Sequence, residues 1–139
     1  MQQTIVVGGT PMYLLVIITR QEDKTYDFLK LLPTVGVRGA TVIEGRGMGK
    51  ILRERETIFT SIEQVLSASI DLMDNVVILS LVQGGEVLAS VRKLARQVFG
   101  DFARPNTGVL FVLPVTDAEG LATGPDMTLP GSAQQGPNV

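Results

Sequence analysis

Residues 36–50 read GVRGATVIEGRGMGK, and the expected fold of the chain depends on how this stretch is interpreted. Its middle, residues 40–44, has the branched apolar composition of a β-strand. Three glycines follow at alternate positions, Gly45, Gly47 and Gly49, and then Lys50. Glycines leave backbone N–H groups uncovered and adopt dihedrals that other residues avoid. Such a turn, with cations nearby, can hold an anion or let a ligand lie against the main chain. The same spacing is also consistent with a sharply bent polar loop that binds nothing.

The composition excludes several classes of protein. The chain has 139 residues, 45% of them hydrophobic, which is enough for one domain with a proper core. Its longest apolar run, residues 13–18, is far shorter than the ~20 residues of a membrane helix, and no basic segment of a secretory signal precedes it. We therefore expect no membrane insertion and a cytoplasmic location. The net charge of −2 argues against nucleic acid as a partner.

The chain contains neither cysteine nor histidine. It therefore lacks thiolate chemistry, the commonest general base and the commonest nitrogen ligand for metals. Catalysis would rest on carboxylates, lysine or hydroxyls, and the candidates Glu44, Asp101, Glu54 and Glu56 show no spacing that suggests a pair. We expect no enzyme, no catalytic residue and no metal-ligating cluster, although an oxygen site for a hard cation stays open.

The pattern of apolar residues predicts six elements in one domain, residues 12–115. They are a strand at 13–19, a helix at 23–32, a strand at 37–44, a strand at 75–82, a helix at 86–99 and a strand at 109–113. Residues 1–11 form an extension whose Ile5, Val6 and Val7 fit an extra edge strand or a loose segment. Residues 50–56 alternate in charge and are expected to be solvated, whereas Ser61 with Gln64 fits a capping box. Residues 116–139 are small and polar, which predicts a flexible tail.

This order is the split βαβ arrangement of the ferredoxin-like fold, an α+β βαββαβ sandwich with a long loop after the second strand. Two helices cover one face of such a sheet, and the other face is bare in a single chain. Because residues 13–19 and 75–82 are apolar throughout, that face would be an exposed apolar surface in a single chain. We therefore expect it to pack against other copies of the chain in a closed ring.

Residues 36–49 and the closing segment NTGVLFVLPV at 106–115 resemble the PII family of signal-transduction proteins and its PII-like branches. The resemblance spans residues 13–115. It implies a homotrimer with clefts between neighbouring subunits, where ATP, ADP, AMP or another adenine-containing ligand binds. It further implies a regulatory role, as in nitrogen regulation. The loop from Ile51 to Asp74 would then contact a target protein, such as a transporter or a metabolic enzyme.

The resemblance also implies which residues line the cleft. Thr41, Gly47 and Gly49 match family positions around the nucleotide, and Gly108 matches a glycine of the second wall. The two walls are the base of the long loop and residues 100–108. The full expected set is Thr41, Gly45, Gly47, Met48, Gly49, Lys50, Arg53, Arg104, Asn106, Thr107 and Gly108.

Several departures from the family pattern favour a divergent PII-like branch. Val109 falls where the family has a phosphate-binding lysine, and residues 116–119 replace an arginine pair. Neither Tyr13 nor Tyr26 lies in the long loop, so control by tyrosine nucleotidylation is not expected. A triphosphate needs several cations or aimed N–H groups. Arg104, Lys50 and Arg53 are candidate substitutes, and plain surface exposure is the alternative for each.

Three other functions stay open at this point. One is weak nucleotide hydrolysis in the cleft. Another is a trimer that handles divalent cations. The third is a structural trimeric interaction module whose cleft stays empty. Titration with ATP, ADP, AMP, cyclic dinucleotides and bicarbonate separates this module from a sensor, because an empty cleft would respond to none of them.

Overall fold

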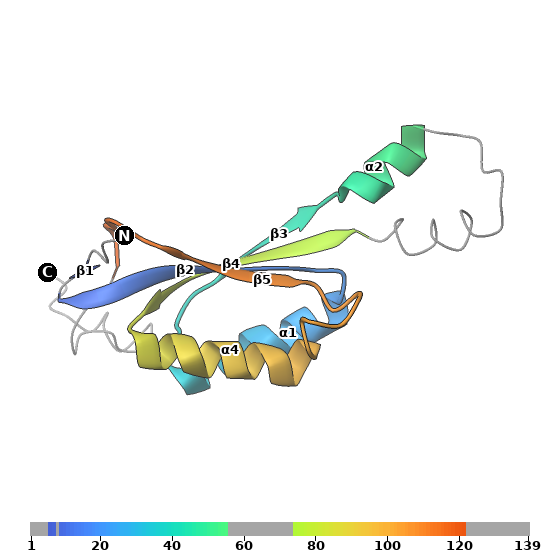
Figure 1. Ribbon diagram of the computed structural model, residues 1–139. Coiled ribbons are helices and arrows are strands. Elements are labelled where there is room, and N and C mark those ends of the chain that lie inside the picture. The colour runs from blue at the N-terminus through green and yellow to red at the C-terminus, as the bar shows by residue number, and fades with distance from the viewer. Residues whose placement is uncertain (1–5, 8, 56–73, 122–139) are drawn as a thin grey trace, which may run out of the picture.

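The computed structural model describes residues 6–7, 9–55 and 74–121. Its elements follow one another as β1 (Val6–Val7), β2 (Thr10–Thr19), α1 (Glu22–Leu31), the 3-10 helix η1 (Leu32–Val35), β3 (Thr41–Gly45), α2 (Met48–Arg55), β4 (Asn75–Gln83), α4 (Gly85–Phe99) and β5 (Val109–Pro114) (Figure 1). The predicted βαββαβ order is confirmed, with α2 added in the long loop. Among the described residues, none of the helices has both the length and the apolar character needed to cross a bilayer.

The strands form an antiparallel sheet in which β2 is central, with β4 on one side and β5 on the other. β3 pairs with the outer edge of β4, which gives the order β3-β4-β2-β5 of the ferredoxin-like fold. The short β1 pairs with the start of β2. Of the two alternatives for the N-terminal extension, the structure therefore shows the extra edge strand.

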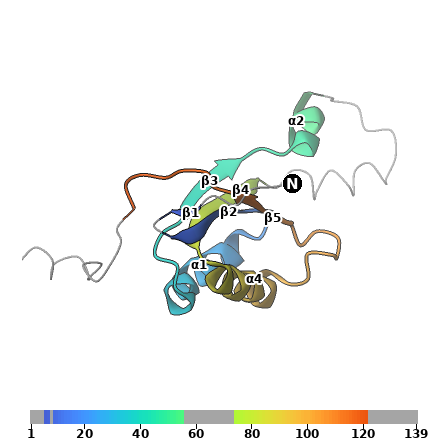
Figure 2. The same ribbon diagram turned by 60° about the vertical axis from the view of Figure 1, so that its left-hand side comes forward.

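Helices α1 and α4 lie side by side against one face of this sheet, and the core lies between them and the strands (Figure 2). Leu15, Ile17 and Ile78 are fully buried there. The rings of Phe28 and Phe99, one from each helix, lie 5.2 Å apart between centroids. The apolar stripe of the second predicted helix faces this core, because Val91 and Leu94 are buried and Val87 and Val98 pack against them.

No helix among the described residues covers the opposite face of the sheet (Figure 2). Successive residues of a strand point to opposite faces, so the registers assign to this face every second residue of each strand. We call it the bare face, and its apolar members are Met12, Leu14, Val16, Ile18, Ile43, Val77, Leu79, Leu81, Val109, Phe111 and Leu113. Several stay exposed, including Val109 (55%), Phe111 (40%) and Leu113 (43%). A contiguous apolar surface of this kind marks an interaction site.

The prediction for the second strand was wrong at its start. β3 begins at Thr41, four residues later than expected, and residues 37–40 are irregular. Val37 is instead turned into the core, where it is 2% exposed, and its N–H donates to the Leu32 carbonyl. The Gly39 carbonyl accepts a hydrogen bond from Ser80 Oγ at 2.7 Å. These two anchors hold the segment beside β4 without a regular ladder.

Met48–Arg55 forms helix α2, which the sequence analysis did not predict, and its residues 50–55 are exposed or half-buried, as expected of a solvated segment. Leucine, arginine, glutamate and lysine are strong helix formers, and here they outweigh the missing apolar stripe. An ion pair between Arg46 and Glu54 ties this helix to the turn before it. The predicted capping box at Ser61 and most of the tail lie outside the described residues.

Candidate ligand-binding site

The glycine-rich turn lies where the β3–β4 ladder ends. Gly45 pairs with Asn75, the first residue of β4. A Cβ on Gly47 would lie only 2.9 Å from Asn75 Nδ2, so the backbone and this side chain are in close contact. The Gly47 carbonyl then accepts from the Ile51 N–H at 3.0 Å as α2 begins. The two ends of the long loop therefore touch at Gly47, and a larger residue there would displace the Asn75 side chain.

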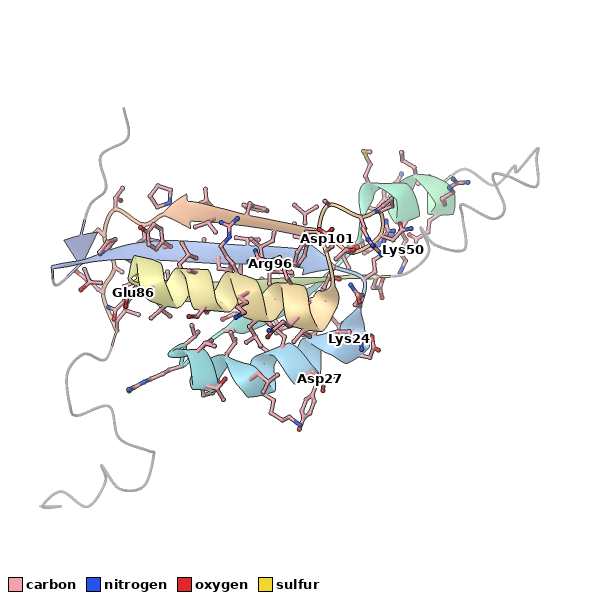
Figure 3. The ribbon with its side chains drawn as sticks, turned by 60° about the horizontal axis from the view of Figure 1, so that its bottom comes forward. Lys24, Asp27, Lys50, Glu86, Arg96 and Asp101 are labelled. Carbon is pink, nitrogen blue, oxygen red and sulfur yellow. The ribbon has the colours of Figure 1, made fainter. Side chains whose placement is uncertain are left out.

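The cations of this turn are matched by carboxylates. Lys50 forms an ion pair with Asp74, which closes the neck of the long loop. Arg46 forms a second ion pair with Glu54. Arg53 is not free either, since it makes an interaction of its own. Figure 3 labels Lys50 near the start of α2. The base of the loop thus presents two ion pairs together with two further arginines of α2, Arg53 and Arg55.

The second wall, residues 100–108, is held by a polar network that the sequence analysis did not identify. The Thr107 carbonyl accepts from Thr19 Oγ1 at 3.1 Å and from Gln21 Nε2 at 2.9 Å. Gln21 Nε2 also donates to the Phe99 carbonyl at 3.0 Å. A Cβ on Gly108 would lie 2.6 Å from the Ile18 carbonyl oxygen, and its φ is +130°. These contacts fix the end of the wall against β2.

The tip of this wall is exposed to solvent. Arg104 and Asn106 are exposed, and Asn106 has a φ of +68°. Asp101 shapes the loop, because its Oδ1 accepts from the Ala103 N–H at 2.9 Å and its carbonyl from the Arg104 N–H at 3.0 Å (Figure 3). This local role accounts for Asp101 without catalysis. Within residues 6–7, 9–55 and 74–121, no group of three or more carboxylates is placed to hold a metal ion.

The two walls lie at the same end of the sheet but at its opposite edges. Gly45 pairs with Asn75 in β4, Val76 with Thr19 in β2, and Ile18 with Val109 in β5. Three strand spacings therefore separate β3 from β5, or roughly 14 Å. One chain alone does not bring the residues of the loop base next to Arg104, Asn106, Thr107 and Gly108.

Thr41 lies at the other end of β3, roughly 13 Å from Gly45 along the strand. It lines a groove of about 700 Å³, which we call the Thr41 groove. The lining residues are Met12, Leu14, Gly36, Val37, Arg38, Gly39, Ala40, Thr41, Leu79, Ser80, Leu81, Gln83, Gly120 and Leu121. Apart from Thr41, the sequence analysis named none of them as site residues. Residues 36–41 are consecutive and belong to the stretch 36–50, whereas the others come from separate segments that only the folded chain assembles.

The Thr41 groove is lined by both apolar and polar surface. Met12, Leu14, Leu79 and Leu81 belong to the bare face, and residues 36–40 bring irregular backbone beside them. Segment 115–121 borders the groove, because the Val115 N–H donates to the Met12 carbonyl at 2.9 Å and Gly120 and Leu121 belong to the lining. Apolar walls with a few polar groups are typical of sites for flat organic ligands.

Comparisons with known proteins agree with this architecture. A family model described as nitrogen regulatory protein P-II matches residues 12–125. PII of Arabidopsis thaliana, solved with citrate, is 21% identical with a TM-score of 0.53, over 79% of this chain and 82% of that one. GlnK of B. subtilis matches at 20% identity in its ATP complex and at 17% in a second structure. Their TM-scores are 0.49 and 0.48, over 76% of this chain and 83% and 86% of theirs.

No curated protein matches the chain. The family match extends over more than three quarters of the sequence, from the first residues of β2 to beyond segment 115–121. The likeness to plant PII independently supports the same fold. The chain therefore belongs to the nitrogen regulatory protein P-II family, whose members are non-enzymatic signal transducers.

Proposed function

We propose that this protein is a cytoplasmic PII-like sensor that binds a small adenine-containing effector at the subunit junctions of a homotrimer. ATP, ADP and AMP are the effectors to test first. The observation that carries the proposal is the position of the two candidate walls, at one end of the sheet but at opposite edges. A ligand that contacts both walls must be held by two copies of the chain.

The bare face supplies the reason for the copies to associate. Its members on β5, Val109, Phe111 and Leu113, are between 40% and 55% exposed in one chain. Burying such side chains contributes about 25 cal/mol per Å² of apolar area. Association around a three-fold axis would cover this face and set β3 of one copy near β5 of the next. The loop base of one copy would then lie beside residues 100–108 of its neighbour, so that the two walls form one cleft.

The loop from Ile51 to Asp74 would carry the signal to a target protein, a transporter or a metabolic enzyme, as in nitrogen regulation. Both ends of this loop meet at Gly47 and Asn75, and Lys50 bridges its neck to Asp74. A ligand at the neck would bind better to one loop conformation than to another, and so would shift the population of loop states.

The test combines assembly with binding. Sedimentation velocity should give a trimer, and calorimetry should detect an adenine nucleotide. Arg104→Ala is the test variant, because Arg104 is an exposed cation of the second wall. We expect it to stay trimeric and to lose at least about tenfold in affinity for the nucleotide, since a charge-assisted hydrogen bond to a phosphate would be lost.

Arg92→Ala is the matched control, because it removes the same exposed cation from the middle of α4, outside both walls. It should bind as wild type does. A stable monomer would overturn the proposal. A trimer without any nucleotide response would favour the structural interaction module, which the bare face supports equally well.

A further inference from the structure

Gln21 joins the two ends of the second wall through a single side-chain amide. Its Nε2 donates to the Phe99 carbonyl at 3.0 Å and to the Thr107 carbonyl at 2.9 Å. Phe99 is the last residue of α4, and Thr107 lies two residues before β5 begins. Because both oxygens are hydrogen-bonded to one nitrogen, they are at most about 6 Å apart. We call these two hydrogen bonds the Gln21 bridge, and they close residues 100–106 into a loop.

The bridge requires a side chain with two donors. Both carbonyl oxygens are acceptors only, and the amide nitrogen carries two protons, one for each of them. The Phe99 carbonyl lies in the last turn of α4, where carbonyls have no partner within the helix. Without the amide this carbonyl would lose its donor, whereas the Thr107 carbonyl would keep the hydrogen bond from Thr19 Oγ1 at 3.1 Å. It is therefore Gln21, and not Thr19, that ties the wall to the end of α4.

The backbone of Gln21 is itself held in place at the start of α1. Its carbonyl accepts from the Thr25 N–H and from Thr25 Oγ1, both at 3.2 Å, and Thr25 is buried. Its N–H donates to Thr19 Oγ1 at 3.1 Å. The amide is thus carried by a fixed segment between β2 and α1, and it defines where the two ends of the wall lie.

The other anchors of the wall stop short of its tip. The Phe102 side chain packs against the core, with its ring 6.3 Å from that of Phe99 between centroids. Residues 103–106 are exposed, and Arg104 is the only cation in residues 100–108. Because the tip is not buried, the place of Arg104 depends on how the two ends of the loop are held.

We infer that Gln21 is a positioning residue of the ligand site, which holds Arg104 in place for a phosphate of the effector by bridging Phe99 and Thr107. This inference rests on the proposed function and adds a determinant of affinity that lies outside both candidate walls. When a wall leaves its binding conformation for part of the time, the apparent affinity falls with the fraction that stays competent. The Gln21 bridge raises that fraction before the ligand arrives.

The test variant is Gln21→Met, which keeps the length of the side chain and removes both donors without adding charge. The full chain is titrated calorimetrically with ATP, ADP and AMP. We expect about fivefold weaker binding than in wild type, the equivalent of one neutral hydrogen bond. We also expect faster hydrogen exchange in residues 100–107 of the ligand-free variant. Gln97→Met is the matched control, because it makes the same substitution at an exposed position of α4 and should bind as wild type does.

A double-mutant cycle separates positioning from a general loss of stability. In the Arg104→Ala background the tip presents no cation, so Gln21→Met should then change the affinity less than about twofold. Gln21→Asn takes the place of Gln21→Met should that variant fail to assemble. It keeps the amide, but its side chain is one methylene shorter and does not span the two carbonyls.

Three results would overturn the inference. The first is wild-type affinity in Gln21→Met, which would leave the proposed function standing. The second is an equal loss of affinity with and without Arg104, because the effect of Gln21 would then not pass through that cation. The third is the absence of binding of all three nucleotides to wild-type protein, which would overturn the proposed function as well.

Discussion

Phe111→Asp is the substitution that tests the assembly most directly. Phe111 lies near the middle of β5 on the bare face, opposite Val16 of β2. It is 40% exposed in the single chain, whereas Val16 is only 5% exposed. In a trimer that covers this face, the exposed part of the ring becomes buried, and an aspartate there would lose its water without gaining a partner.

The size of the effect follows from this exposed area. A phenylalanine side chain presents roughly 200 Å², so 40% corresponds to roughly 80 Å². At about 25 cal/mol per Å² this is about 2 kcal/mol for each chain and about 6 kcal/mol for three chains. The association constant of a trimer would fall about 10⁴-fold, which raises the midpoint concentration of assembly about 100-fold. Desolvation of the carboxylate adds to this cost.

Sedimentation velocity over a wide range of protein concentrations measures this midpoint. Tyr26→Asp is the matched control, because it also exchanges an aromatic ring for a carboxylate. Tyr26 is 68% exposed on α1, which lies on the opposite side of the sheet from the bare face. The control should assemble as wild type does.

Two outcomes would refute the reasoning. Phe111→Asp weakens assembly only if the bare face is the interface, so unchanged assembly would exclude that face. Equal weakening by Tyr26→Asp would show that the effect comes from charge or stability in general. Circular dichroism of both variants confirms that each chain is folded before the comparison is made.

Two further predictions concern the second wall. Gly108→Val should lower the free energy of unfolding in urea by at least about 2 kcal/mol, because its Cβ would lie 2.6 Å from the Ile18 carbonyl oxygen at a φ of +130°; a wild-type unfolding curve would contradict this. Thr19→Val removes the Oγ1 donor to the Thr107 carbonyl and should cost about 1 kcal/mol. In this variant we expect faster hydrogen exchange in residues 101–108. Unchanged exchange there would refute the conclusion that the Thr19 hydroxyl holds the second wall against β2.

The order of elements could be predicted from the sequence because each element carries its own local signal. The continuous apolar run in β2 and the spacing of Val87, Val91 and Leu94 in α4 are set by which faces must leave water. The bare face followed from the same argument, since strands that are apolar on both faces cannot be covered by helices on one side alone.

The boundaries around the glycine-rich turn could not be predicted in this way. β3 starts at Thr41 and not earlier because Val37 is drawn into the core and Gly39 is bonded to Ser80, a residue of another strand. α2 forms where the sequence shows only alternating charges, and the Arg46–Glu54 pair supports it. Contacts between distant segments decided both outcomes.

The sequence alone determined the sandwich, its apolar faces and the residue types available for binding, because composition and periodicity are properties of the chain itself. The tertiary structure decided where those residues lie relative to one another. It placed Thr41 at the start of β3 and Lys50 beyond the end of β3, in α2 beside Asp74, and it built a groove from segments far apart in the chain. Distances across a sheet depend on strand order and register, which only the folded chain fixes.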